Sequence, residues 1–403
     1  MAKKKSSSRG GGIPKNLQGV AGLVVIGVVV LFGFLGLDPL GLFGGGDQSP
    51  AQTGEEAFGE EPAPVVESAP SSGAWWEVYF TDPINMNNPD QMAGSIEETL
   101  INYIDAATTT IHIAAFEFNL TPLAEALIAA HARGVEVRWV TDDEHGLEAD
   151  EEEDRGQFAM LEEAGIEVRD DGRSALMHNK FIIFDGQMVW TGATNLTVNG
   201  IFENNNNVIV LRSARIAAIF ENEFQEMWAG EFGPTSSSTV DDQSVTVEGV
   251  PVQILFGSED EAIAHLLPYI EGAQSSIRFM AFSFTQDDLG DAMLARGEAG
   301  VDLAGIFETR GSETEASELG KLFCAGYAMR QDGNPSTFHH KVIVIDAQIV
   351  VTGSLNFSEN ADNSNDENVV IITEPNIAKL FLEEFDRRWA EAKEPDGGDL
   401  GCE

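Results

Sequence analysis

Two related stretches decide the fold of this 403-residue chain: MHNKFIIFDGQMVWTGATNLTVNG at residues 177–200 and FHHKVIVIDAQIVVTGSLNFSENA at residues 338–361. Each contains a histidine, a lysine two residues later, and then an apolar run that predicts a buried strand. Side chains at positions i and i+2 point to the same face of a strand, so each histidine is expected to project beside its lysine. The chain therefore carries a duplicated motif.

The duplication extends upstream of the motifs. AAFEFNLTPLAEALIAAHARGVEVRWVTDD at residues 114–143 matches MAFSFTQDDLGDAMLARGEAGVDLAGIFET at residues 280–309, and each segment reads as strand, helix and strand. These segments are 166 residues apart and the motifs 161 apart, so the first copy is longer by five residues, where the acidic stretch DEHGLEADEEED lies. We expect two α/β halves of one topology.

The amino-terminal region predicts a membrane anchor. Residues 19–37 are uncharged, about the length that crosses a bilayer, and follow a basic flank that is expected to stay in the cytoplasm. No small-x-small site follows closely, which favours a retained anchor over a cleaved signal peptide. The next segment is rich in Gly, Pro, Ala, Ser and Glu, which is typical of a disordered tether. We predict an anchor at 1–43, a tether at 44–74, a first half at 75–238, a second half at 239–395 and a tail at 396–403.

Charge and cysteine content restrict the function. The chain has 23 Lys and Arg against 67 Asp and Glu, a formal net charge of -44. Such a body repels nucleic acid at long range, and solubility in a salty habitat explains the acidity more simply than a specific cationic partner. Cys324 and Cys402 do not have the spacing of a metal site. We expect no metal and no cofactor.

The aligned polar residues of the two motifs form the candidate site. After each strand comes Gly-(Ala/Ser)-x-Asn, in which glycine allows close backbone approach and asparagine offers an amide donor. Imidazoles, ammonium groups and amides from both copies would form a cationic pocket that suits a phosphate. The candidates are His178, Lys180, Asp185 and Asn195 in the first copy, and His339, Lys341, Asp346 and Asn356 in the second.

The duplicated pattern HxKxxxxD followed by GSxN or GAxN resembles the phospholipase D superfamily over residues 75–392. The resemblance implies two halves around a pseudo-twofold axis, both motifs in one site, and a metal-independent phosphodiesterase. One histidine would form a phosphohistidine, while the other would protonate the leaving group and then activate water or an alcohol. By this analogy His178 attacks and His339 is the acid, while the lysines and asparagines hold the phosphoryl oxygens.

The two copies differ from each other at one position that the family uses. Twenty-eight residues after each histidine stands Asn206 in the first copy and Glu367 in the second. Family members often use a carboxylate here to orient a histidine across the pseudo-twofold axis, so Glu367 is expected to orient His178. The alternative for the asparagine run is a polar loop. The motif aspartates Asp185 and Asp346 sit at strand ends, which favours a structural turn over a catalytic role.

The sequence is compatible with three function classes. A phospholipid phosphodiesterase is the first, because a tether would hold the site near headgroups, with the body outside the cytoplasmic membrane and one chain as the active unit. A surface or secreted nuclease of the same superfamily is the second. A catalytically silent binding or scaffolding module is the third, and two complete motifs argue against it. The other histidines have no predicted chemical role: His112, His131, His145, His265 and His340.

Overall fold

The computed structural model describes residues 71–153, 155–236, 243–398 and 400–402. The predicted membrane span at 19–37 lies outside them, as do residues 44–70 of the predicted tether and the predicted boundary after residue 238. None of the helices in the described part of the chain is both long and apolar enough to cross a bilayer.

The first half contains an eight-stranded mixed sheet. Its strand order is β1-β2-β8-β7-β6-β3-β4-β5, with β3, β4 and β5 parallel and the other neighbours antiparallel. The central strands are apolar on both faces, as expected for a sheet covered on both sides. The strands are β1 (Ser71–Ser72), β2 (Trp76–Phe80), β3 (Thr110–Ala115), β4 (Glu136–Thr141), β5 (Glu167–Asp170), β6 (Lys180–Phe184), β7 (Met188–Gly192) and β8 (Asn207–Arg212).

The second half repeats this sheet strand for strand. Its order is β9-β10-β16-β15-β14-β11-β12-β13, with the same alternation of parallel and antiparallel neighbours. The prediction of an α/β fold in two matching halves is confirmed. The strands are β9 (Ser244–Val247), β10 (Val250–Phe256), β11 (Ser276–Ala281), β12 (Asp302–Phe307), β13 (Ala328–Gln331), β14 (Lys341–Ile345), β15 (Ile349–Gly353) and β16 (Asn368–Thr373).

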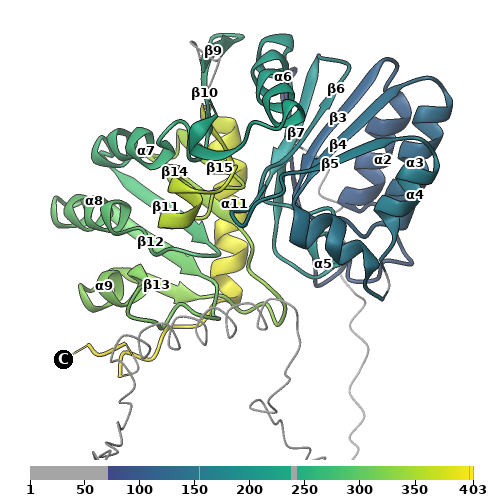
Figure 1. Cartoon of the computed structure of the whole chain (residues 1–403). Coiled ribbons are helices and arrows are strands. Elements are labelled where there is room, and N and C mark those ends of the chain that lie inside the picture. The colour runs from purple at the N-terminus through teal and green to yellow at the C-terminus, as the bar shows by residue number, and fades with distance from the viewer. Residues whose placement is uncertain (1–70, 154, 237–242, 399, 403) are drawn as a thin grey trace, which may run out of the picture. The chain divides into compact units, whose positions relative to one another are not determined.

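The helices form three layers around the two sheets (Figure 1). Helices α2 (Ile96–Ala106), α3 (Thr121–Ala132) and α4 (Gln157–Glu163) cover the outer face of the first sheet, and α7 (Ala262–Glu271), α8 (Asp287–Glu298) and α9 (Glu318–Cys324) cover that of the second. Helices α6 (Ala214–Ala229) and α11 (Pro375–Glu391) pack between the sheets. Two short helices follow the motifs: α5 (Val198–Phe202) and α10 (Glu359–Asn363). The acidic stretch contains a π-helix at Asp143–Glu148 and a 3₁₀ turn at Ala149–Glu151. Another 3₁₀ turn lies at Gly233–Thr235.

One hydrophobic core joins the halves. Side chains of both sheets meet α6 and α11 in a single buried cluster that includes Phe181, Phe220, Val342 and Phe381. Phe181 and Phe220 contact edge to face, with ring centroids 5.0 Å apart. Replacing one such buried phenylalanine by alanine typically costs about 3–5 kcal/mol. The shared core therefore fixes the two motifs relative to each other.

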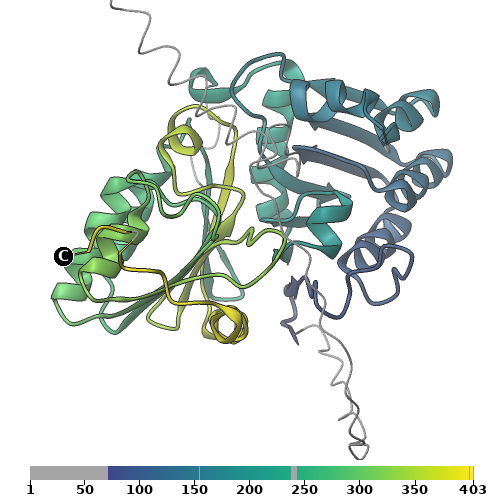
Figure 2. The same ribbon diagram turned by 90° about the horizontal axis from the view of Figure 1, so that it is seen from below.

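Both ends of the described body are attached to the folded halves. Ser71–Ser72 pairs with β2, because Trp75 and Trp76 are buried and carry the hairpin back into the stretch assigned to the tether. At the other end, a disulfide joins Cys324, at the end of α9, to Cys402. Figure 2 shows the carboxyl-terminal segment running beside the helices of the second half. The cysteine pairing was not predicted from the sequence.

Candidate active site

The two motifs are joined backbone to backbone across the halves. In each copy the strand begins at the lysine, so the histidine lies in the segment just before it. The N–H of His178 donates to the carbonyl of Asp366 at 2.9 Å, and the N–H of His339 donates to the carbonyl of Asn205, also at 2.9 Å. Each histidine is therefore held by the segment that precedes the last strand of the opposite sheet.

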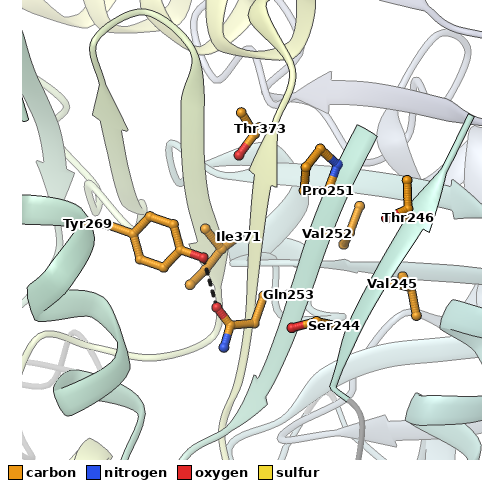
Figure 3. Close-up of a pocket in the computed structure, with 9 residues that line it drawn as sticks. All are labelled: Ser244, Val245, Thr246, Pro251, Val252, Gln253, Tyr269, Ile371 and Thr373. Carbon is orange, nitrogen blue, oxygen red and sulfur yellow. Dashed lines mark hydrogen bonds between the residues drawn. The ribbon is translucent and has the colours of Figure 1, made fainter. Parts of the chain in front are cut away.

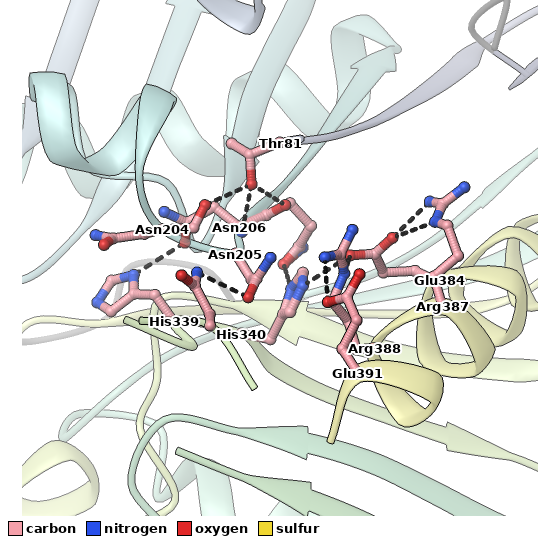
Figure 4. A network of polar contacts seen from close by, with 12 residues as sticks. Thr81, Asn204, Asn205, Asn206, His339, His340, Glu384, Arg387, Arg388 and Glu391 are labelled. Atoms are coloured by element: carbon pink, nitrogen blue, oxygen red, sulfur yellow. Dashed lines mark hydrogen bonds and ion pairs between the residues drawn. The ribbon is translucent and has the colours of Figure 1, made fainter. Parts of the chain in front are cut away.

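The histidine side chains have different partners. Nδ1 of His178 lies 2.7 Å from Oε2 of Glu367, whose two oxygens also accept hydrogen bonds from Ser354 and Asn365. Nδ1 of His339 lies 2.9 Å from Oδ1 of Asn206 (Figure 4). All four interacting side chains are buried. The structure thus pairs one histidine with a carboxylate and the other with a neutral amide.

The last three residues of the asparagine run, Asn205, Asn206 and Asn207, are buried, and Asn206 contacts the second motif. Asn206 is fully buried, and its amide nitrogen donates to the carbonyl of Gly200 at 2.8 Å. Its backbone N–H donates to the hydroxyl of Thr81 at 2.7 Å. This donation to a carbonyl turns Oδ1 toward His339, so the imidazole must donate its Nδ1–H to Asn206.

The two lysines are equivalent. Nζ of Lys180 donates to the carbonyl of His178 at 2.8 Å, and Nζ of Lys341 donates to that of His339 at 2.9 Å. Each ammonium group also lies over a phenylalanine ring, at 5.2 Å for Phe116 and 4.7 Å for Phe282 in the second half. A lysine has three N–H donors, so each ammonium keeps donors for an anion.

Burial sets the protonation of these groups. Burial and the two nearby ammonium groups lower the pKa of His178 and of His339 well below the usual imidazole value. Burial lowers the pKa of Lys180 to about 8, and burial together with the charge of Lys180 lowers that of Lys341 well below its usual value. Burial also raises the pKa of Glu367 to about 8, against the opposing effect of Lys180. These effects agree with the contacts of His178 and His339 across the halves, which bring both motifs into one cluster.

The signature asparagines flank this site unequally. Nδ2 of Asn195 donates to Oε1 of Glu117 at 2.6 Å, and Oδ1 of Asn195 is buried without a hydrogen bond among the described residues. Oδ1 of Asn356 is likewise buried and unpaired within that part of the chain. The glycines before them require close approach, since a Cβ at Gly192 would lie 2.3 Å from the carbonyl oxygen of Asn207.

The motif aspartates lie away from the cluster. Asp185 and Asp346 follow β6 and β14 at the end opposite the lysines, and both have positive φ. Oδ1 of Asp185 accepts the backbone N–H groups of Thr109 and Thr110 at 2.7 and 3.0 Å. Burial alone would raise the pKa of Asp185, but these hydrogen bonds lower it to about 2. The geometry supports the structural alternative for both aspartates.

Several buried polar residues near the motifs were missed by the sequence reasoning. Asp142 and Glu308, which follow β4 and β12, accept the backbone N–H groups of Met177 and Phe338 at 3.1 and 2.6 Å. The sequence could have indicated these two residues, because an acidic residue stands at the same aligned position in both copies. Asn207 and Asn368 were also missed; each donates to a threonine of the opposite half, Thr352 and Thr191, at 2.7 Å.

Two histidines without a predicted role also lie near the motifs. His145 contacts Oδ1 of Asp142 at 3.0 Å, and its ring lies 4.8 Å from that of Phe116. Fully buried His340 contacts Asn207 and Glu384, each at 3.3 Å, and Glu384 also binds two arginines of α11 (Figure 4). Burial lowers the pKa of His340, so this histidine forms a neutral support behind the motif.

Other polar groups and pockets lie outside the cluster. A cavity of about 150 Å³ is found at the β9–β10 edge of the second sheet, where Tyr269 donates to Gln253 at 2.9 Å (Figure 3). No motif residue lines it. Within the described residues, two sets of carboxylates are close enough to share a cation, and neither contains a motif residue: Asp142, Asp143 and Asp171, and Glu223, Glu226 and Glu259.

Two α/β halves of one topology, which bring duplicated His-x-Lys motifs into one site, define the class of this protein. The family model described as "Cardiolipin synthase, PLD-like domain" matches residues 100–228 and 266–389. The chain belongs to the phospholipase D superfamily.

Curated relatives match about one third of the chain. The mitochondrial cardiolipin hydrolase of Xenopus laevis is 36% identical over 132 residues, which are 33% of this chain and 63% of that protein. The human protein of the same name is 33% identical over 142 residues, covering 35% and 56% of the two chains. The matched region spans only 52% to 63% of the length of the relatives compared.

A solved structure shows the fold over most of the chain. The phosphatidylserine synthase of Haemophilus influenzae aligns with a TM-score of 0.59 at 14% identity, covering 81% of this chain and 89% of that one. At this identity the likeness concerns the fold alone.

Proposed function

We propose that this chain is a membrane-anchored, metal-independent phosphodiesterase that hydrolyses headgroup phosphodiesters of phospholipids. The observation that carries the proposal is the pair of contacts at His178 and His339, which each use Nδ1 to contact a polar side chain of the opposite half. Neither Nε2 makes a hydrogen bond to any described residue, so both are left for reaction at phosphorus. The reciprocal contacts also support a pseudo-twofold relation between the halves.

The proposed reaction has two displacements. Nε2 of His178 bonds to phosphorus as the bond to the leaving oxygen breaks, and His339 gives its Nε2 proton to that oxygen. Water then attacks the phosphohistidine, His339 takes a proton from this water, and the bond between phosphorus and His178 breaks. Splitting one difficult displacement into two is the advantage of covalent catalysis.

The surrounding side chains stabilise charge in each step. Lys180, Lys341, Asn195 and Asn356 are proposed to hold the phosphoryl oxygens, and Glu367 is proposed to orient the nucleophile. Burial and the ammonium groups keep the pKa of the acid histidine low in the free enzyme. A bound phosphodiester brings a negative charge and favours the imidazolium, so the acid would acquire its proton as substrate binds.

A phospholipid fits this chain better than a polynucleotide. The net charge of -44 opposes approach of nucleic acid, whereas a short headgroup needs only the local cationic site. The relatives from Xenopus laevis and human are named cardiolipin hydrolases, which supports the same substrate class here. One chain supplies both motifs, so we propose a monomeric active unit.

The proposed location is the outer side of the cytoplasmic membrane. The uncharged stretch at 19–37 follows a basic flank, which favours an amino terminus in the cytoplasm. The disulfide between Cys324 and Cys402 supports this location, because disulfides persist in oxidising compartments.

The full-length chain in excess EDTA tests the activity. We expect cardiolipin in vesicles to be converted to phosphatidic acid and phosphatidylglycerol, and single-stranded DNA to be cleaved little. Preferential DNA cleavage would instead identify a nuclease, and turnover of neither substrate would favour a binding module. Loss of lipid hydrolysis in EDTA would overturn the metal-independent mechanism.

Protease added outside intact cells tests the location. We expect the full-length protein in the membrane fraction, with the body digested from outside. A body that stays protected until the cells are opened would overturn the orientation.

A further inference from the structure

The two halves differ beside the signature asparagines. Glu117 follows β3 in the first half, and Ser283 occupies the aligned position after β11 in the second. In both halves this segment lies against the segment that carries the asparagine: the N–H of Asn119 donates to the carbonyl of Leu196 at 3.2 Å, and the equivalent bridge in the second half joins residues 284 and 357. The aligned residues therefore face equivalent surroundings with different chemistry.

Glu117 binds the asparagine of its own half. Its Oε1 accepts from Nδ2 of Asn195 at 2.6 Å, and its Oε2 lies 3.6 Å from Nη2 of Arg155. These side chains are largely buried. Arg155 directly follows the acidic stretch that lengthens the first copy. In the second half Oδ1 of Asn356 is buried without a hydrogen bond among the described residues, and the residue aligned with Glu117 is Ser283, which has no carboxylate.

A carboxylate partner fixes which way an asparagine points. The oxygen and nitrogen of a side-chain amide exchange places by a flip of 180°, and an ionised carboxylate only accepts hydrogen bonds. Glu117 therefore requires the NH₂ group of Asn195 on its side, and a flipped amide would set two oxygens against each other. In the enforced orientation one N–H binds Glu117 and the second is available to a phosphoryl oxygen. Hydrogen bonds to an ionised group are about twice as strong as neutral ones, which favours a single orientation.

The same carboxylate acts on the motif lysine. Burial lowers the pKa of Lys180 to about 8, and the charges of Glu367 and Glu117 oppose that effect. For Lys341 the opposing carboxylates are Glu367 and Glu308. Glu117 thus contacts Asn195 directly, and its charge also acts on Lys180.

We propose that Glu117 is a positioning residue that holds Asn195 with its amide N–H toward the phosphoryl group. The role of Asn195 as a phosphate ligand rests on the proposed function. The second half has Ser283 in place of this carboxylate, so phosphate would be held more rigidly on the side of His178.

The test compares Glu117→Gln with Glu117→Asp, and uses Ser283→Ala as the matched control in the second half. Two readouts are taken on the full chain: hydrolysis of bis(p-nitrophenyl) phosphate, and calorimetric binding of inorganic phosphate. The glutamine variant is also made in an Asn195→Ala background. Glutamine keeps the size of the side chain but accepts either amide orientation.

We expect Glu117→Gln to lower kcat/KM about tenfold and to weaken phosphate binding about fivefold, and to move the alkaline limb of the pH profile to lower pH. In the Asn195→Ala background the loss should shrink to less than about twofold. Glu117→Asp keeps the carboxylate, so its kcat/KM and phosphate binding should stay within about threefold of the parent. The control variant Ser283→Ala should have the same kcat/KM and phosphate binding as the parent.

Simple electrostatics predicts the opposite sign, because removing a negative charge should tighten phosphate binding. Phosphate binding by Glu117→Gln that equals or exceeds that of the parent would overturn the proposal, as would a full loss in the Asn195→Ala background. An aspartate variant as impaired as the glutamine variant would also overturn it. If the parent fails to hydrolyse the diester while the phosphate-binding difference is found, the proposed function fails and the positioning role stands.

Discussion

The two halves have the same strand topology, and they differ in the side chains that contact the two motif histidines. Strand order, neighbour pairing and the lysine contacts repeat from one half to the other. His178, however, contacts the carboxyl of Glu367, while His339 contacts the amide of Asn206. The duplicated scaffold therefore places two imidazoles equivalently and gives them unequal chemistry.

The difference reaches beyond the histidine contacts. Ser354 donates to Glu367 at 2.6 Å, whereas the aligned Ala193 has no hydroxyl for Asn206. The hydroxyl and the carboxylate thus occur together on one side only. A carboxylate stabilises an imidazolium and raises the nucleophilicity of its ring, while an amide only fixes the tautomer. This asymmetry supports distinct roles for the two histidines and makes the assignment testable.

The largest expected effect is loss of either histidine. His178→Ala and His339→Ala should each lower turnover of a phospholipid by about 10³-fold or more, because one removes the nucleophile and the other the proton carrier. With bis(p-nitrophenyl) phosphate, whose leaving group needs little protonation, His339→Ala should still form a covalent adduct and His178→Ala should not. Mass spectrometry of the quenched protein locates the adduct. A phosphohistidine at residue 339 in the parent chain would reverse the two roles.

Substitutions at Glu367 and Asn206, the partners of the two histidines, should have smaller effects on turnover, and these effects should be unequal. Glu367→Gln should lower turnover about 10²-fold, because the carboxylate that supports the attacking imidazole is lost. Asn206→Ala should cost less than about tenfold in turnover, since the amide contributes orientation alone. Initial rates under substrate saturation make the comparison, with Asn206→Ala as the matched change in the other half. Equal losses at the two positions would contradict the assigned asymmetry.

The fold and the paired motifs were predictable because duplication repeats a signal. The aligned copies at residues 177–200 and 338–361 indicated two equivalent halves, and the strands begin within them as expected. Glu367 was found for the same reason, since an aligned position with different residues stands out. Asp142 and Glu308 carried a similar signal that was overlooked, because both are acidic and no difference drew attention to them.

Contacts that depend on packing between elements were not predictable. His340 was expected to be inert, yet its neighbours are Asn207 from the other half and Glu384 from α11. Strand alternation gives the face of a residue but not the helix that covers that face. The disulfide between Cys324 and Cys402 depends in the same way on the path of the carboxyl-terminal segment past α9. Glu117 could be recognised as a candidate only from its contact with Asn195 in the structure.

The pH profile should show a bell with its maximum near pH 8. Burial raises the pKa of Glu367 to about 8, so below that pH the carboxyl is protonated and loses the negative charge that supports the imidazole of His178. Burial lowers the pKa of Lys180 to about 8, so above that pH its ammonium loses its charge. Each limb should approach a tenfold fall in kcat/KM per pH unit. Rates measured from pH 5.5 to 10 test this, and Glu367→Gln should remove the acid limb. A flat parent profile from pH 6 to 9.5 would contradict both assignments.

The smallest expected effect lies in the hairpin turns that end the motif strands. Gly186 and Ala347 occupy the same place after the motif aspartates, with φ of 61° and 54°. A left-handed conformation costs a residue with a Cβ about 1–2 kcal/mol, while glycine adopts it freely but loses about 0.4–1 kcal/mol more entropy on folding. Ala347→Gly should therefore raise the free energy of unfolding by up to about 1 kcal/mol, and Gly186→Ala should lower it by a similar amount. Both turns are far from the lysines, so kcat should stay within about twofold. Urea unfolding at equilibrium measures the two shifts, and shifts of the same sign would show that the turns are not equivalent.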